Sequence, residues 1–240
     1  MSSIVIVDLG TGNLHSVGKA LEHVCAEAGN GARVHVSAQP RAIADADRLV
    51  LPGQGALGAW IERLNASPAL RDAVYARLHP DATPDSTSDS TPDSTKGPVL
   101  GICLGLQALY ARSEENGGLD GLGLLRGTVR HFAGAQCNER NERDHDRRRK
   151  IPHMGWNRVR HTRAHPLWRG IADQQRFYFV HSYFVDSEAR DEVVGECEYG
   201  HVFTAAAARD NLFATQFHPE KSHRAGLQLL RNFIAWDGAR

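Results

Sequence analysis

Short apolar runs alternate with amphipathic stretches along most of this chain. The runs at residues 4–7, 33–36, 48–51, 99–102, 176–185 and 212–217 are rich in β-branched and aromatic side chains and predict strands. The stretches at 17–28, 57–78 and 104–115, and the one after Ser222, predict helices, the second of them broken near Pro68. Because continuously apolar strands are typical of burial on both faces, the alternation predicts an α/β fold with a doubly wound, mostly parallel sheet flanked by helices.

Two polar segments interrupt this alternation. Residues 80–97 form a low-complexity segment of Asp, Ser, Thr and Pro, and residues 137–150 are dense in Arg, Asp, Glu and Asn. Neither segment can bury apolar area, so both are expected to be surface loops inserted into a single domain that spans residues 1–240.

Composition narrows the class of protein. Of 240 residues 41% are hydrophobic, which suffices for a sizeable core, and no apolar run approaches the length of a transmembrane helix. The N-terminus has no signal-peptide pattern. Lys+Arg and Asp+Glu both number 28, which gives no reason to expect a nucleic-acid partner. Four widely spaced cysteines without C-x-x-C argue against disulfides and zinc, so we expect a cytoplasmic protein without metal or cofactor.

The strongest chemical signal is the pattern G-x-C-x-G at residues 101–105, directly after a predicted strand. A strand that reverses into a helix at one residue needs glycines on both sides of that residue, and this is the nucleophile-elbow pattern with sulfur in place of a serine oxygen. A helix that begins at Cys103 would favour its thiolate. The alternative interpretation of Cys103 is a small buried core residue.

A nucleophilic thiol needs a base and an acid that orients the base. His218 and Glu220 stand two apart at the end of a predicted strand, so in extended geometry both side chains project to the same side. Pro219 between them restricts the backbone. Together with the elbow, the pair predicts a Cys103–His218–Glu220 triad, since such triads are recognised by roles and geometry rather than by chain order.

Two further segments carry weaker signals. The glycine-rich loop at 52–56 also follows a strand and is a candidate source of backbone N–H groups for an oxyanion hole. Residues 151–157 combine Met154 and Trp156 in a turn-like setting, which fits a partner surface if both are exposed and core packing if they are not. The glycine-rich turn at 8–16 lacks a complete G-x-G-x-x-G, so nucleotide binding is not favoured.

Six motifs together resemble one family over residues 4 to about 236. G-I-C-L-G-L-Q at 101–107 and Q-F-H-P-E-K-S at 216–222 resemble the class I, or triad, glutamine amidotransferases, which have a flavodoxin-like fold with a nucleophile elbow. D-L-G-T-G-N-L-H-S at 8–16, L-P-G-Q-G-A at 51–56, P-H-M-G-W-N at 152–157 and F-V-H-S-Y at 179–183 are similar to the glutaminase subunits of imidazole glycerol phosphate synthase, of histidine biosynthesis. Gln54 departs from the small apolar residue that the family often has there.

The resemblance implies a role for each matching position. Cys103 would attack the carboxamide carbon of L-glutamine, His218 would carry the proton and Glu220 would orient the imidazole. The expected oxyanion-hole donors are backbone groups of Leu104 and of Gly53, Gln54 and Gly55. The expected glutamine-binding residues are Gln107, Glu115, His181, Ser182 and Tyr183. The expected interface residues are Asn13, Met154, Trp156, Asn157 and Lys221.

The resemblance also implies a partner on another chain. Ammonia would pass to a cyclase subunit with a (βα)8 barrel, which makes imidazole glycerol phosphate and aminoimidazole carboxamide ribotide. We expect slow glutamine hydrolysis without that partner, because a loop such as 53–55 can withhold an oxyanion donor. The alternatives are the glutaminase of another amidotransferase, a catalytically inactive regulatory subunit, and a cysteine peptidase or thioesterase on an elbow fold.

Overall fold

A computed structural model of the protein describes residues 2–29, 31–79, 97–134 and 150–239. The two predicted loops at 80–97 and 137–150 lie outside these ranges, apart from Gly97 and Lys150 at their ends. The described residues build one sheet in which one half consists of parallel strands and the other half of mostly antiparallel strands.

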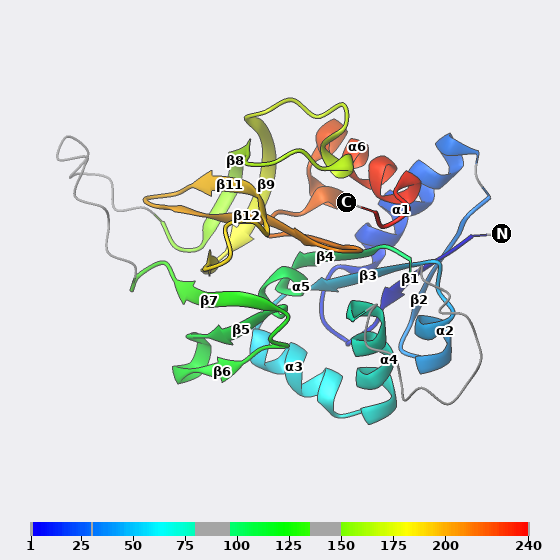
Figure 1. The fold of residues 1–240 in the computed structure, drawn as a ribbon, viewed down its shortest axis with the longest axis horizontal. Coiled ribbons are helices and arrows are strands. Elements are labelled where there is room, and N and C mark those ends of the chain that lie inside the picture. Colours follow the sequence, from blue (N-terminus) through cyan, green and yellow to red (C-terminus); the bar gives the residue numbers. More distant parts are fainter. Residues whose placement is uncertain (1, 30, 80–96, 135–149, 240) are drawn as a thin grey trace.

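The parallel half of the sheet confirms the predicted doubly wound fold. Its strands lie in the order β2 (Arg33–Ser37), β1 (Ser3–Val7), β3 (Arg48–Gly53), β4 (Val99–Cys103) and β13 (Leu212–Thr215). In Figure 1, α1 (Leu14–Ala28) and α6 (His223–Ala235) lie on one face of these strands, and α2 (Pro40–Ala44), α3 (Leu57–Asn65) and α4 (Pro68–Leu78) lie on the other. The break predicted near Pro68 therefore separates two helices.

The strands direct alternate side chains to two hydrophobic cores. In β1, Ile4 and Ile6 pack in the core beneath α1 and α6, whereas Val5 and Val7 pack in the core beneath α2, α3 and α4. All four side chains are buried. This period of two explains why residues 4–7 include no polar side chain, since both faces of the strand are covered by helices.

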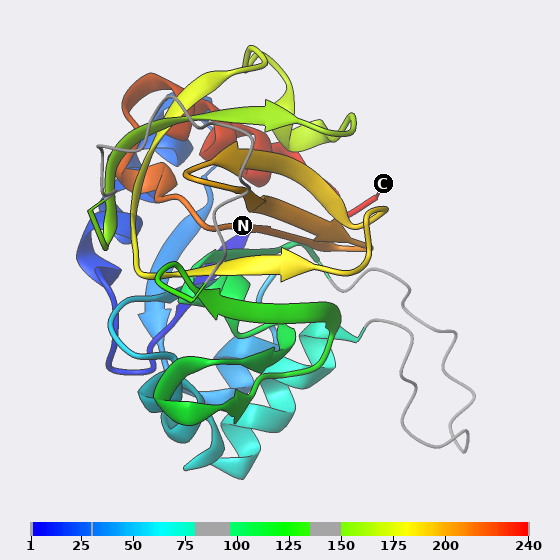
Figure 2. The same ribbon diagram turned by 90° about the vertical axis from the view of Figure 1, so that its left-hand side faces the viewer.

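The antiparallel half extends the sheet beyond β13. Its order is β12 (Val202–Arg209), β10 (Tyr183–Ser187), β7 (Leu125–His131), β5 (Tyr110–Ser113) and β6 (Leu119–Asp120), with β5 parallel to β7. A branch from β12 runs through β11 (Val193–Glu198) and β8 (His153–His161) to β9 (Gln175–His181). Figure 2 views the molecule from this end, with these strands in front. The carboxyl ends of β3, β4 and β9 thus meet near one another.

The helix predicted for residues 104–115 is wrong in length. The helix α5 spans only Leu104–Gln107, and the chain then continues as strand β5. Every residue from Leu104 to Tyr110 is buried, and all but Gln107 are apolar or glycine or carry an aromatic ring, so the pattern does not distinguish helix from strand. Pairing of Tyr110 with Leu125 on β7 makes it a strand.

Three other local expectations need correction. Residues 153–157 are not in a turn but open the nine-residue strand β8. The β-prone run 176–185 is divided at Ser182 into β9 and β10. Pro219–Lys221 form the 3-10 turn η3 rather than continuing the strand.

Candidate active site

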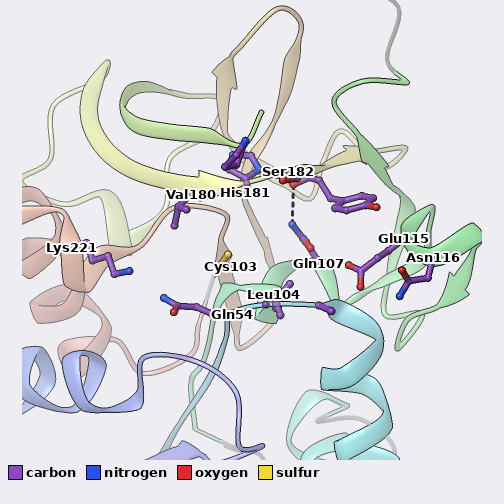
Figure 3. Close-up of a pocket in the computed structure, with 14 residues that line it drawn as sticks. Gln54, Cys103, Leu104, Gln107, Glu115, Asn116, Val180, His181, Ser182 and Lys221 are labelled. Carbon is purple, nitrogen blue, oxygen red and sulfur yellow. Dashed lines mark hydrogen bonds between the residues drawn. The ribbon is translucent and has the colours of Figure 1, made fainter. Parts of the chain in front are cut away.

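A cavity of about 580 Å³ opens where β3, β4 and β9 end. The elbow of β4, the loop after β3, η1 (Glu115–Gly117) and the β9–β10 connection form its walls. Figure 3 shows Cys103 in the middle, Gln107 and Glu115 on one side, and Gln54 and Lys221 on the other. The lining residues are Gln54, Gly55, Ala56, Cys103, Leu104, Gln107, Glu115, Asn116, Pro152, Val180, His181, Ser182, Tyr183 and Lys221.

The turn at Cys103 has the geometry that the glycine pattern predicts. Cys103 has φ 58° and ψ −103°, a backbone region that side-chain-bearing residues rarely adopt. A Cβ on Gly105 would lie 1.9 Å from the carbonyl oxygen of Leu51, and one on Gly101 would lie 2.8 Å from the Cβ of Ala214. Both glycines are therefore required by close packing of the elbow against the neighbouring strands. Since α5 is only one turn long, its dipole contributes little electrostatic stabilisation to a thiolate at Cys103.

His218 and Glu220 form the expected pair, although across the start of a 3-10 turn. His218 Nδ1 lies 2.8 Å from Glu220 Oε1, and the two side chains are 2% and 1% exposed. The backbone N–H of His218 donates to Tyr178 O on β9 at 2.9 Å, which holds the main chain at His218 against β9. His218 Nε2 is buried and forms no regular hydrogen bond within the described ranges, which leaves it for the thiol of Cys103.

The surroundings of His218 stabilise its protonated form. Burial by itself lowers the pKa of His218, but the adjoining Cys103 and the hydrogen-bonded, negatively charged Glu220 outweigh burial and raise the pKa to about 10. His218 therefore carries a proton at neutral pH that it can give to a reacting group. The arrangement supplies a nucleophile, a proton donor and an orienting carboxylate at one end of the cavity.

Gln216 is a site residue that sequence reasoning missed. Its Nε2 donates to Cys103 Sγ at 3.7 Å, and its Oε1 accepts from Gln107 Nε2 at 3.1 Å. The side chain is fully buried. The sequence signal was an amide in the mostly apolar run L-F-A-T-Q-F at 212–217, because a buried amide needs partners.

The residues expected to bind glutamine line the cavity together. Gln107 Nε2 also donates to Tyr183 O at 3.0 Å (Figure 3), so both of its N–H groups have partners in the protein. Glu115 accepts from the backbone N–H groups of Leu57 at 3.1 Å and Gly58 at 3.3 Å. Its carboxylate thus caps the N-terminus of α3, where Ala56 has no side-chain cap.

The expected oxyanion donors divide into two groups. Leu104, Gln54 and Gly55 line the cavity. Gly53 does not line it; it is the last residue of β3, paired with Cys103, and a Cβ there would lie 2.7 Å from atoms of Leu104 and Trp60. Their role as oxyanion donors stays a prediction.

The expected interface residues lie on β8 and on two neighbouring turns. On β8, Met154 is 61% exposed and Trp156 is 43% exposed, whereas Asn157 projects to the opposite face of the strand. Asn13 caps α1 by accepting from Ser16 N at 3.3 Å. Lys221 lines the cavity from η3, which contacts both α1 and β9. Whether these residues contact a partner stays a prediction.

The described residues show neither a metal-binding cluster nor a membrane-spanning helix. No cluster of three or more His, Cys, Asp or Glu side chains that could hold a metal ion occurs within the described ranges. None of the described helices is long and apolar enough to cross a membrane.

Comparisons with known proteins point to one family. The family "Glutamine amidotransferase class-I" matches residues 87–236. The "Imidazole glycerol phosphate synthase subunit HisH 1" of Pseudomonas aeruginosa is 47% identical over 241 residues, which cover 99% of this chain and 99% of the relative. The HisH subunit of Acinetobacter baylyi is 44% identical over 99% of this chain and 100% of its own.

Solved structures share the fold at much lower identity. A Thermoplasma acidophilum protein described as a GMP synthase subunit aligns with a TM-score of 0.61 at 19% identity, over 98% of this chain and 93% of its own. A structure described as glutamine amidotransferase aligns with a TM-score of 0.63 at 15% identity, over 96% and 97%. These two similarities concern the fold alone.

Proposed function

This chain belongs to the class-I glutamine amidotransferases, among the HisH subunits of imidazole glycerol phosphate synthase, and we propose that the cavity at Cys103 is its glutaminase site. It is an enzyme of histidine biosynthesis that hydrolyses L-glutamine to glutamate and ammonia. The observation that carries the assignment of the site is the buried His218–Glu220 pair beside a thiol held at a strained elbow, within a cavity of substrate size.

The reaction follows from the order of these three side chains. The thiolate of Cys103 attacks the carboxamide carbon of glutamine, and the C–N bond breaks as the imidazolium of His218 gives its proton to the leaving nitrogen. Ammonia departs and a thioester remains. His218 then takes a proton from water, whose oxygen displaces the sulfur and releases glutamate. Glu220 holds the ring in one orientation throughout.

The free hydrogen-bonding groups of the cavity suit glutamine. Both N–H groups of Gln107 have protein partners, so its Oε1 is the atom left to accept a hydrogen bond from a substrate N–H. Glu115 supplies a carboxylate for the α-ammonium group while it also caps α3. Ser182 and the residues beside it offer backbone groups to the α-carboxylate, and Leu104 with the loop at 53–55 offers N–H groups to the oxyanion.

The partner is a cyclase subunit with a (βα)8 barrel, which uses the ammonia to make imidazole glycerol phosphate and aminoimidazole carboxamide ribotide. Two observations support this proposal: the full-length relatives are named as synthase subunits, and β8 exposes Met154 and Trp156 near the cavity. Exposed aromatic and methionine side chains are enriched in protein interfaces. Hydrolysis is slow without the cyclase, because the loop at 53–55 then withholds an oxyanion donor. One missing donor lowers the rate roughly 100- to 1000-fold.

The first test is glutamine hydrolysis by the purified chain, alone and then with the cyclase and its nucleotide ligand. We expect a large rise on adding both. The Cys103→Ala variant should lose glutamine-dependent synthesis and retain ammonia-dependent synthesis by the complex. Equal activity of the isolated chain and the complex would refute the gating proposal. Loss of both syntheses in the variant would mean that Cys103 is structural.

A further inference from the structure

Two buried histidines outside the triad touch each other at the wall of the cavity, which His181 lines. His153 on β8 is 3% exposed and His181 at the end of β9 is 6% exposed. His153 Nδ1 lies 2.9 Å from His181 Nε2, and His181 Nδ1 lies 2.7 Å from the carbonyl oxygen of Tyr183. The reaction described above uses neither imidazole.

One backbone carbonyl sets the direction of every hydrogen bond in this cluster. The oxygen of Tyr183 can only accept, so His181 carries its proton on Nδ1 and its Nε2 must accept from His153 Nδ1. His153 Nε2 then accepts from Asn157 Nδ2 at 3.3 Å. The amide of Asn157 is oriented for this because its Oδ1 accepts from Arg158 N at 2.8 Å.

Both imidazoles stay neutral at physiological pH. Burial lowers the pKa of His153 to about 4, and burial together with the neighbouring His153 lowers the pKa of His181 to about 3. Each ring therefore keeps one donor and one acceptor nitrogen, and the order of donors and acceptors is fixed.

The same carbonyl also connects the histidines to the nucleophile. Tyr183 O has two lone pairs and accepts a second bond from Gln107 Nε2 at 3.0 Å. Gln107 donates its other N–H to Gln216 Oε1, which turns the Gln216 amide so that its Nε2 faces Cys103 Sγ. A continuous chain of hydrogen bonds thus runs from β8 through the β9–β10 connection to the thiol.

We propose that His153, His181 and Gln216 are positioning residues of the glutaminase, which hold Gln107 and the Cys103 thiol in their reactive orientations through this chain. The inference rests on the proposed function of the cavity. It also connects the two faces of β8: Met154 and Trp156 are exposed on one face, and His153 and Asn157 begin the chain on the other. A protein that docks on Met154 and Trp156 would therefore press on the strand that carries the first link.

Packing at His153 allows hydrogen bonding to be separated from aromatic contact. The ring is stacked between Tyr199, at 4.0 Å, and Phe179, at 4.8 Å between ring centroids. His153→Phe keeps this stack and removes both hydrogen bonds. His153→Asn removes the stack but keeps a donor near the position of Nδ1. A positioning role predicts that the Asn variant is the more active of the two, whereas a packing role predicts the reverse order.

A matched control is present on the same strand. His161 is stacked on Trp168 at 4.3 Å, and no described residue bonds its Nε2. His161→Phe is thus the same substitution in a similar stack outside the chain of hydrogen bonds, and its activity should stay within about twofold of wild type.

Two readouts test the proposal in full-length protein. The first is kcat and KM for glutamine hydrolysis by the complex with the cyclase. The second is the rate at which iodoacetamide alkylates Cys103 in the isolated protein, followed by mass spectrometry of the peptide that contains it. We expect His153→Phe to lower kcat about tenfold or more, with KM changed less than about threefold, and to slow alkylation. His153→Asn should recover a large part of both losses.

The outcomes separate this inference from the proposed function. If His153→Phe equals or exceeds His153→Asn in both readouts, the positioning role is overturned. If the wild-type complex fails to hydrolyse glutamine, the proposed function fails, and the order of alkylation rates still decides the inference. If His153→Phe does not fold, Gln216→Leu decides it: alkylation slowed at least threefold supports the chain, and an unchanged rate overturns it.

Discussion

The strained backbone at Cys103 should lower the free energy of unfolding by a measurable amount. The φ of 58° and ψ of −103° place a side-chain-bearing residue in a region that suits glycine, at a cost of about 1–3 kcal/mol. Gly101 and Gly105 on either side are fixed by close contacts, so the elbow cannot relax by shifting the chain. We therefore expect glycine at position 103 to relieve strain that alanine retains.

The comparison of Cys103→Gly with Cys103→Ala isolates this strain, because both variants lack the thiol. At an ordinary buried strand position, glycine is less stable than alanine by about 1.5 kcal/mol in total, from backbone entropy and one lost methyl group. Relief of strain at 103 offsets this loss. The expected difference therefore lies between about 0.5 kcal/mol in favour of alanine and about 1.5 kcal/mol in favour of glycine.

Ala207→Gly is the matched control for that comparison. Ala207 is fully buried on β12 in regular pairing with Ala214, and its φ is not positive. Free energies of unfolding from urea titrations would be compared for the two Ala-to-Gly pairs. If glycine costs the same at 103 as at 207 within about 0.5 kcal/mol, the elbow stores no strain and the reasoning is refuted. Both variants at 103 should lack glutamine hydrolysis.

Three further predictions follow from single contacts. Glu115→Gln removes the charge expected to meet the α-ammonium group, so KM for glutamine should rise about tenfold or more. The free energy of unfolding from urea titration should change by only about 1 kcal/mol. An unchanged KM would exclude that role. Burial, with Arg163, lowers the pKa of His165 to about 4. As pH falls, His165 therefore takes up a proton in the unfolded chain before it does so in the folded protein. The free energy of unfolding should decrease by on the order of 3 kcal/mol between about pH 6.5 and 4. His165→Asn should flatten that part of the pH dependence in urea titrations, and a slope identical to wild type would contradict the argument. Gly105→Ala should destabilise the fold by about 3 kcal/mol or more, because its Cβ would lie 1.9 Å from Leu51 O; a melting temperature equal to wild type, measured by circular dichroism, would show that the elbow tolerates a side chain.

The parallel strands and their helices were predictable because their signals are local. Residues 4–7 and 48–51 are apolar without interruption, apart from Arg48 at the start of the second run, and the strands Ser3–Val7 and Arg48–Gly53 contain them. The elbow was equally predictable, since its two glycines stand within two residues of Cys103 and both prove to be required by close contacts. In each case the residues that determine the conformation are neighbours in the chain.

The segment after Cys103 could not be predicted in the same way. Leu104 to Tyr110 are all buried, so the hydrophobic pattern has no period from which helix or strand could be read. Its conformation is decided by pairing of β5 with β7, whose partner residues are fifteen or more positions away. The position of Glu115 depends on the same pairing, which is why its contact with the N-terminus of α3 was not foreseen.

Sequence distance also separates the parts of the site that a motif reveals from those it hides. His218 and Glu220 are two residues apart, and their bond was expected from the sequence. His153 and His181 are 28 residues apart, and Gln107 and Gln216 are 109 apart. The groups that perform bond chemistry need a fixed short geometry, which a short motif can encode. The groups that hold them in place can come from any strand that reaches the cavity, so only the folded sheet identifies them.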